Sequence, residues 1–421
     1  MIFIANTLPM NGGSTFLLRI CKELHSRGEK VAVLLLFSHK TEDLNLKSSI
    51  GQYADIHYLS SFSYAPLYFL FSSQLGIFSP IRFKELASFF KKYGSIAHVM
   101  GVFGLLFLAR AVKAGCVLKS CTVGVYHQNE FMYPDYKTYF SRYAKEIFCS
   151  FSPGSIIFFN EFNVMKYTSF FGIDYSASRV VPIGIEMPKT IVNSIPVSEL
   201  TRIVSIGNLV NFKTYNAHVI NILPALLKIK PNLIYEIYGA GPNETVLKLL
   251  VLSLNLDHYV RFHGIVDYVD FKKILLNSFA FVGSGTAILE ASALGVPSIV
   301  GIESSHEPVT YGFLSDVSGL AYNENFDQKK YFIYDKISWL LADVENWSKI
   351  SKGCHDKSKE FSIDKTANIF IEVRSSLPES LVFNKISPSK VLFSICLHYL
   401  KMKLGLLKRS FFERRNEGSS F

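Results

Sequence analysis

The stretch from Phe281 to Val300 places the strongest constraint on how this chain folds. An apolar strand leads into a Gly-rich turn at Gly285, a helix follows, and Gly295 and Pro297 precede a second apolar strand. The first backbone N–H groups of a helix have no partner within the helix, so such a turn favours an anion. Glu290 lies in the first turns of the helix, where its carboxylate would reach a ligand bound at the helix N-terminus. We therefore expect a binding site for an anionic ligand here.

Strand and helix patterns alternate along two stretches of the chain, which predicts two doubly wound, parallel α/β sheets. At 421 residues the chain is also too long for one ordinary domain. The polar, Pro-containing residues 187–198 are typical of a linker. We therefore predict a first domain over residues 1–186 and a second domain over residues 199–375, closed by a helix over residues 361–375.

The net charge of +10 is unevenly distributed. Residues 1–190 carry 19 basic and 12 acidic side chains (+7), residues 191–375 carry 17 and 19 (−2), and residues 376–421 carry 8 and 3 (+5). A basic, aromatic-rich surface suits anionic lipid headgroups, although it also occurs on merely soluble proteins. No nucleic-acid motif accompanies the charge, so we expect no nucleic-acid partner.

The tail at residues 376–421 mixes apolar residues with lysines over residues 389–409, which predicts an amphipathic helix. Such a helix either lies on a membrane surface or packs back on the globule. Residues 56–81 contain no Asp, Glu, Lys or Arg, but several polar residues and prolines interrupt them. We expect this segment to be a shallow membrane contact or a core helix and not a membrane span.

The six cysteines occur singly, with no Cys-x-x-Cys pair, which indicates a reducing compartment and no zinc site. The N-terminus has the pattern of a strand and lacks the basic and apolar regions of a signal peptide. We therefore expect a cytoplasmic protein that is peripheral on the inner face of the membrane.

Polar or glycine residues follow several of the expected strands, where open α/β sheets bind their ligands. Gly12 and Gly13 follow the first strand, and they form either a ligand-binding turn or an ordinary capped helix start. His127 ends another strand and is either catalytic or structural. Lys213 follows the strand at residues 202–206 and is either a point charge for a phosphate or a solvent-exposed lysine.

Taken together, these motifs resemble the retaining glycosyltransferases of family 4, which have two facing Rossmann-like domains in the architecture called GT-B. The resemblance spans roughly residues 1–375 and is strongest in the second domain. The motifs that match the family are Asn11-Gly12-Gly13, Pro182-Ile-Gly184, Gly207-Asn-Leu-Val-Asn-Phe-Lys213, Tyr238-Gly-Ala-Gly-Pro242, Phe262-His-Gly264 and Leu289-Glu-Ala-Ser-Ala-Leu-Gly-Val-Pro297.

The resemblance implies a role for each matching position. Lys213 matches the lysine that contacts the donor diphosphate, and Glu290 matches the glutamate that binds the donor ribose. The backbone amides near Gly285, Thr286 and Ala287 are expected to face the diphosphate or the donor sugar. His127 matches the acceptor-side histidine, within a loose alignment. Glycine turns and one polar residue complete the expected binding set: Gly12, Gly13, Asn208, Gly239 and Gly241.

Two positions depart from the family pattern. Asn208 stands where the family has an arginine, and Val282 stands where the family often has a first glutamate, eight residues before Glu290. A catalytically silent scaffold of the same fold at the membrane surface is therefore an alternative. A sugar-nucleotide epimerase is a further one, which the loop ending at Lys213 disfavours.

The leading interpretation is a glycosyltransferase that takes a UDP- or GDP-sugar as co-substrate. It would transfer the sugar with retention to a lipid-linked or cell-envelope glycan, as in O-antigen, capsule or lipopolysaccharide synthesis. No Asp-x-Asp motif occurs in the chain, so we expect neither a metal nor a further cofactor. Helix-start amides together with Lys213 would stabilise the leaving diphosphate, and the donor site would form one half of an interdomain cleft.

Overall fold

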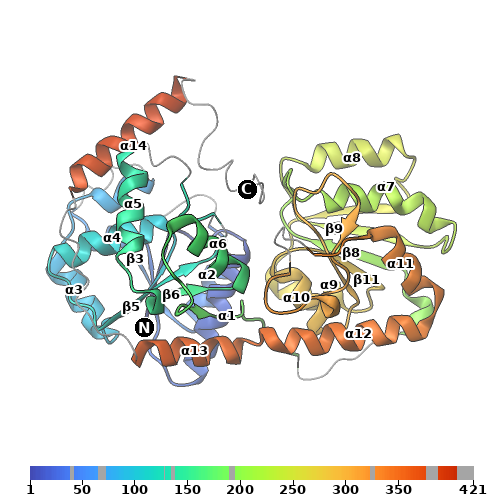
Figure 1. Cartoon of the computed structure of the whole chain (residues 1–421), viewed down its shortest axis with the longest axis horizontal. Coiled ribbons are helices and arrows are strands. Elements are labelled where there is room, and N and C mark those ends of the chain that lie inside the picture. The colour runs from blue at the N-terminus through green and yellow to red at the C-terminus, as the bar shows by residue number, and fades with distance from the viewer. Residues whose placement is uncertain are drawn as a thin grey trace. The chain divides into compact units, whose positions relative to one another are not determined.

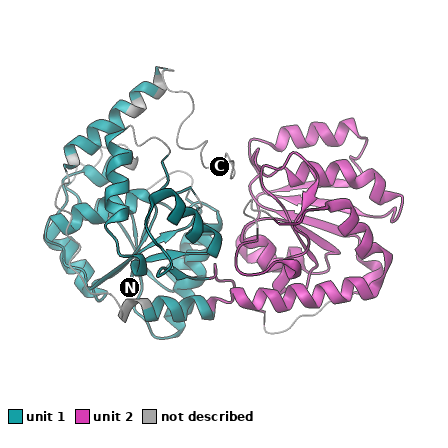
Figure 2. Ribbon diagram, in the orientation of Figure 1, with its two compact units in different colours: residues 1–181, 364–415 teal, residues 182–363, 416–421 magenta. Residues whose placement is uncertain are grey.

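The computed structural model describes residues 1–37, 42–64, 73–127, 129–133, 138–188, 195–322, 328–375 and 387–404. These residues divide into two compact units (Figure 2). Unit 1 contains Met1–Val181 and the two C-terminal helices, whereas unit 2 contains Pro182–Ile363. Most of the expected linker, residues 189–194, lies outside the described residues.

Unit 1 is built on a seven-stranded parallel sheet with helices on both faces (Figure 1). The strand order is β3-β2-β1-β4-β5-β6-β7, so the chain reverses direction across the sheet between β1 and β4. The strands are β1 (Ile2–Ala5), β2 (Ala32–Leu35), β3 (Asp55–Tyr58), β4 (Ile96–Met100), β5 (Ser120–Val125), β6 (Ile156–Phe158) and β7 (Arg179–Val180). The helices between them are α1 (Gly12–Ser26), α2 (Leu44–Gly51), α3 (Phe83–Lys92), α4 (Val102–Lys113), α5 (Tyr139–Cys149) and α6 (Glu161–Phe171).

Unit 2 repeats the same design with five parallel strands in the order β10-β9-β8-β11-β12. The strands are β8 (Arg202–Ile206), β9 (Ile234–Tyr238), β10 (Val260–Gly264), β11 (Ala280–Gly283) and β12 (Ser298–Val300), and a small hairpin pairs β13 (Val309–Thr310) with β14 (Tyr331–Phe332). The helices are α7 (Tyr215–Leu227), α8 (Glu244–Ser253), α9 (Phe271–Leu275), α10 (Thr286–Ala293), α11 (Ile333–Ala342) and α12 (Val344–Ser358). The central strands of both sheets, such as β1, β2, β8 and β11, are buried and largely apolar, as is typical of doubly wound sheets. The prediction of two Rossmann-like α/β domains is therefore confirmed.

Helix α13 (Ile363–Ser375) corrects the predicted domain boundary. We expected it to close the second domain, but from Asp364 onward it belongs to unit 1. Phe370 is buried there, with its ring centroid 4.9 Å from that of His98 and 6.0 Å from that of Phe3. Arg27 donates to the Asn368 side chain at 2.5 Å. The prediction was wrong because the order of elements along a chain does not say which core buries the apolar face of a terminal helix.

Helix α14 (Pro388–Lys403) confirms a helix in the tail and packs against α5 of unit 1 (Figure 1). Val391 and Ile395 are buried in the unit 1 core, and the Ser394 hydroxyl accepts from the Phe140 N–H at 3.1 Å. The rest of the expected tail, residues 376–386 and 405–421, lies outside the described residues.

Residues 56–81 divide among short elements where they are described, namely part of β3, a 3₁₀ turn at Leu59–Phe62 and another at Ser73–Phe78. Residues 65–72 lie outside the described residues. Within the described parts of the chain, no helix has both the length and the apolar character needed to cross a membrane.

Candidate functional site

The candidate site of unit 2 lies where the strand order reverses, between β8 and β11. Ligands of open α/β sheets bind beyond the carboxyl ends of the strands at such a switch point. The segment after β8 carries Asn208 and Lys213, and the turn after β11 carries Ser284 and Gly285. The structure therefore brings the loop lysine and the Gly-rich turn, which are about seventy positions apart in the sequence, to the same edge of one sheet.

Lys213 is partly buried, not solvent-exposed as a loop lysine would ordinarily be. Its Nζ lies so close to Gly207 that a Cβ at position 207 would be 2.7 Å from it. Burial lowers the pKa of Lys213, but charge interactions with Tyr215 and Glu303 and a hydrogen bond to Tyr215 outweigh burial and raise the pKa. Lys213 is thus a fixed positive charge at the switch point, suited to a phosphate group.

The N-terminus of α10 supplies backbone donors beside this charge. Gly285 occupies the N-cap position with φ 66° and ψ −153°, a conformation that side chains with a Cβ avoid, and no side chain caps this end. The Tyr322 hydroxyl donates to the Gly285 carbonyl at 3.0 Å and holds the turn. The amides of Thr286 and Ala287 lie in the first turn of α10, as the sequence predicted, where the helix dipole favours an anion.

Glu290 lies one turn further along α10 and is partly buried. The hydroxyl of Tyr268, in a 3₁₀ turn before α9, donates to Glu290 Oε1 at 3.1 Å. This hydrogen bond fixes the position of the Glu290 carboxylate. Sequence reasoning missed Tyr268 because nothing in its neighbourhood forms a motif.

Glycines allow the turns after β8 and β9 to pack against each other. A Cβ at Gly239 would overlap the Gly207 carbonyl, and a Cβ at Gly241 would overlap the Leu209 carbonyl. Leu209 N–H donates to Ala240 O at 3.0 Å, which fastens the two turns together. Gly239 and Gly241 thus have a structural role: their lack of a side chain lets the segment that carries Lys213 pack against the turn after β9.

Asn208, by contrast, is exposed at the start of this segment. Val282 does not reach the turn at all. It lies inside β11, its side chain is fully buried in the unit 2 core, and its carbonyl accepts from the Ser205 hydroxyl at 2.6 Å. Only Ser284 and Gly285 separate β11 from α10, so counting eight residues back from Glu290 reaches the strand and not a loop.

A carboxylate is nevertheless present at this turn. Glu303, which follows β12, accepts a hydrogen bond from the Ser284 hydroxyl at 2.7 Å. The Tyr215 hydroxyl lies 3.3 Å from the same Ser284 oxygen. Sequence reasoning missed Glu303, although its position just after a buried strand was a signal that could have found it.

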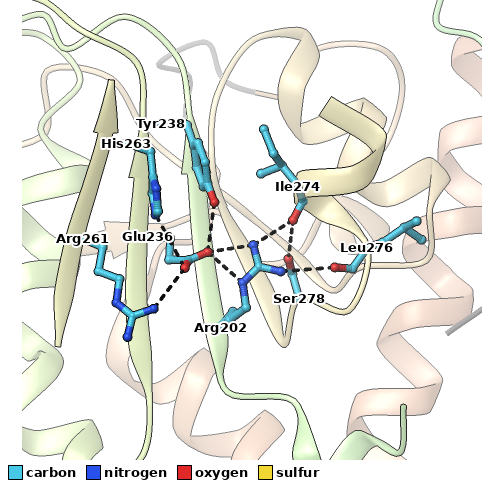
Figure 3. A network of polar contacts seen from close by, with 8 residues as sticks. All are labelled: Arg202, Glu236, Tyr238, Arg261, His263, Ile274, Leu276 and Ser278. Carbon is cyan, nitrogen blue, oxygen red and sulfur yellow. Dashed lines mark hydrogen bonds and ion pairs between the residues drawn. The ribbon is translucent and has the colours of Figure 1, made fainter. Parts of the chain in front are cut away.

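A buried polar network fixes the neighbouring strands β9 and β10 (Figure 3). Its centre is the Glu236 carboxylate, which accepts from Arg202 Nε at 2.7 Å and from the Tyr238 hydroxyl at 3.1 Å. His263 Nε2 lies 3.5 Å from Glu236 Oε1, and the His263 ring stacks on Tyr238 with centroids 4.3 Å apart. A buried carboxylate needs such partners, and here they come from the three neighbouring strands β8, β9 and β10.

Arg202 also connects this network to α9. Its guanidinium donates to the carbonyls of Ile274 at 2.9 Å and Leu276 at 3.3 Å (Figure 3). These carbonyls lie at the C-terminal end of α9, where a positive charge is favourable. We therefore assign the network a structural role in unit 2.

Unit 1 places its candidates at the carboxyl edge of its own sheet. Helix α1 begins at Gly12, and the side chain of Asn11 caps it by accepting from Ser14 N–H at 2.9 Å. Gly12 and Gly13 therefore form the first turn of a capped helix, in line with the simpler of the two readings. His127 follows β5, and its Nδ1 accepts from Asn129 N–H at 3.3 Å.

A family model matches part of the chain, within unit 2. Residues 191–351 match the family model described as Glycosyl transferases group 1. No curated protein sequence matches the chain significantly. The matched region covers nearly all of unit 2. It includes all the candidate site residues of unit 2 and none of those of unit 1.

Solved structures extend the likeness to both units. HepE (Alr3699) from Anabaena, in complex with UDP and glucose, has a TM-score of 0.62 at 16% identity, with 89% of this chain and 99% of that chain covered. The lipopolysaccharide outer core galactosyltransferase WaaB has a TM-score of 0.55 at 13% identity, covering 88% and 98%. WaaG, a glycosyltransferase involved in lipopolysaccharide biosynthesis, has a TM-score of 0.56 at 10% identity, covering 89% and 100%. The fold predicted from the sequence motifs is therefore confirmed.

Proposed function

We propose that this glycosyltransferase, a GT-B protein with a group 1 domain, transfers the sugar of a nucleotide-sugar donor to a lipid-linked or cell-envelope glycan. The binding of the donor is supported by one observation: Lys213 and the α10 N-terminus both lie at the switch point of the unit 2 sheet. Glycosyl transfer requires stabilisation of a leaving diphosphate, and a fixed ammonium with helix-start amides provides it.

The donor site uses its residues as follows. Lys213 and the amides of Thr286 and Ala287 bind the diphosphate. Glu290, held by Tyr268, accepts hydrogen bonds from the ribose hydroxyls. The complex of HepE with UDP and glucose supports a uridine nucleotide as the first donor to test. We propose that this set works without a metal ion, because the ammonium and the helix dipole already oppose the diphosphate charge.

Transfer proceeds with retention in this proposal. We assign no carboxylate of the proposed site the role of a nucleophile, and the leaving phosphate helps to remove the acceptor proton. His127, at the carboxyl edge of the unit 1 sheet, serves on the acceptor side. The reaction takes place in the cytoplasm, at the inner face of a membrane that the basic unit 1 and the tail helix contact. The lipopolysaccharide enzymes among the structural neighbours support this class of acceptor.

A panel of UDP- and GDP-sugars tests the proposal by turnover. Lys213→Ala should lower turnover by about a hundredfold, as removal of one donor to a developing anion does. Glu290→Ala should raise the KM for the donor. Lys228→Ala, an exposed lysine at the other end of α7, is the matched control and should leave turnover unchanged. Unchanged turnover in Lys213→Ala together with an unchanged donor KM in Glu290→Ala would refute the assignment.

A further inference from the structure

Glu303 is a carboxylate inside the proposed diphosphate site, where a negative charge opposes the expected ligand. It lies in the segment after β12, and Ser284 Oγ donates to its Oε1 at 2.7 Å. Ser284 immediately precedes the Gly285 turn that begins α10. The carboxylate is thus held beside the helix end that we assign to the diphosphate.

Backbone contacts fix this position. Ser304 N–H donates to Phe212 O at 2.6 Å, so the residues next to Glu303 and Lys213 are hydrogen-bonded to each other. Gly301 N–H donates to Gly283 O at 2.7 Å, which connects the same segment to the end of β11. The segment after β12 is therefore hydrogen-bonded both to the segment after β8 and to the end of β11.

The charges at this point are coupled. Burial raises the pKa of Glu303, whereas the charge of Lys213 and the hydrogen bond from Ser284 act in the opposite direction. The Glu303 charge in turn helps to keep Lys213 protonated. An ammonium taken out of water is costly without a counter-charge, so Glu303 stabilises Lys213 while no anion is bound.

A bound diphosphate changes this balance. Its negative charges take over as partners of Lys213 and come close to the Glu303 carboxylate. Two like charges at one site raise the pKa of the weaker acid, and the carboxylate is then neutralised by a proton from solvent. The resulting carboxylic acid can donate a hydrogen bond to a phosphate oxygen.

We propose that Glu303 is the counter-ion of Lys213 in the empty donor site and takes up one proton when a nucleoside diphosphate binds. The proposal rests on the donor site described under the proposed function, and it adds a proton to the binding equilibrium. Nucleotide affinity then falls as pH rises above the point at which free Glu303 ionises, and at its steepest the fall is about tenfold per pH unit.

The titratable groups around Glu303 come from two elements. Lys213 and Tyr215 belong to the segment that follows β8 and to the start of α7. Further along α7, His218 Nε2 lies 3.0 Å from the Ser305 carbonyl and so faces the same segment. The turn after β11 contributes the Ser284 hydroxyl. The raised pKa of Lys213 keeps this side chain protonated over the pH range of the experiment, so Lys213 does not account for a change in that range.

Calorimetry with UDP and with GDP on the full chain tests the proposal between about pH 7.5 and 9, above the second phosphate pKa of about 6. Titrations in two buffers of different ionisation enthalpy count the protons taken up. The wild-type chain should take up close to one proton per nucleotide and lose affinity with rising pH. Glu303→Gln should bind more tightly at pH 9, with no proton uptake and no pH slope, because its amide imitates the neutral acid.

Two further variants separate Glu303 from its surroundings. Glu307→Gln removes an exposed carboxylate from the same segment and should behave like the wild type. Ser284→Ala removes a hydrogen bond to the ionised form, so the loss of affinity should begin at higher pH. His218→Gln should keep the slope.

Proton uptake that persists in Glu303→Gln, or weaker binding with an unchanged slope, would overturn the proposal and leave the donor site standing. If neither nucleotide binds the wild-type chain at any pH, both the donor site and the Glu303 proposal fail.

Discussion

At the scale of single residues, the proposed donor site is surrounded by side chains that belong to no sequence motif. The Tyr268 hydroxyl and the Glu290 carboxylate are 3.1 Å apart, and Tyr322 holds the carbonyl of Gly285. Each tyrosine comes from a segment distant in sequence from the turn that it supports. Motif residues such as Glu290 were therefore predictable, whereas the residues that orient them were not.

Replacing Tyr268 by Phe isolates one such contact. The change removes the hydroxyl and keeps the ring, so Glu290 loses a hydrogen bond to a charged group, which is worth about 1.5–3 kcal/mol. We expect the donor KM to rise at least about tenfold with little change in kcat, because the contact concerns ribose binding and not the reacting bond.

Tyr259→Phe is the matched control, since Tyr259 is also partly buried in unit 2 and touches no proposed site residue. Steady-state kinetics with the accepted donor decide the question. An equal loss of kcat and kcat/KM in Tyr268→Phe would instead place the hydroxyl in the chemical step.

At the scale of secondary-structure elements, helix α14 presents two apolar faces. Val391 and Ile395 are buried in the unit 1 core. Phe393 and Leu400 are 70% and 53% exposed. Leu397 lies between them in sequence, and helical periodicity puts it on the same side of the helix. Exposed Lys390 and Lys401 accompany these residues. An exposed apolar stripe with lysines suits the surface of an anionic membrane.

Vesicle flotation tests the role that we propose for α14. Phe393→Ser combined with Leu400→Ser should move the full chain from anionic vesicles to the soluble fraction. This pair is preferable to deletion of the tail, because deletion would also remove Val391 and Ile395 from the unit 1 core.

Val117→Ser is the matched control, as an equally exposed apolar residue of unit 1. Binding that the double variant retains, or binding that neutral vesicles support equally well, would contradict the proposed contact with anionic lipid.

At the scale of the whole molecule, the chain crosses from unit 1 to unit 2 near Val181 and returns after Ile363. The return places α13 and α14 on the core of unit 1. Helices α13 and α14 therefore contribute to the stability of unit 1, and unit 2 is, among the described residues, a single segment, Pro182–Ile363.

Phe370→Ala tests this arrangement. Truncating a buried Phe costs about 3–5 kcal/mol, and here the cost should fall on unit 1 because Phe370 packs on Phe3, Phe16 and His98. Hydrogen exchange should show faster exchange in β1 and β4, with exchange in β8 and β11 unchanged. Faster exchange in the unit 2 strands would mean that α13 supports the second unit, as its sequence position alone suggested.

The sequence by itself determined the elements and the positions of most motifs of the proposed donor site. Apolar periodicity and glycine positions depend on short-range geometry, so two parallel sheets, the Gly285 turn, Lys213 and Glu290 could be predicted from neighbouring residues. Tertiary structure alone decided which core buries α13 and that Glu303 meets Ser284. These outcomes depend on which strands become neighbours in a sheet, and strand order brings together residues whose separation along the chain carries no local signal.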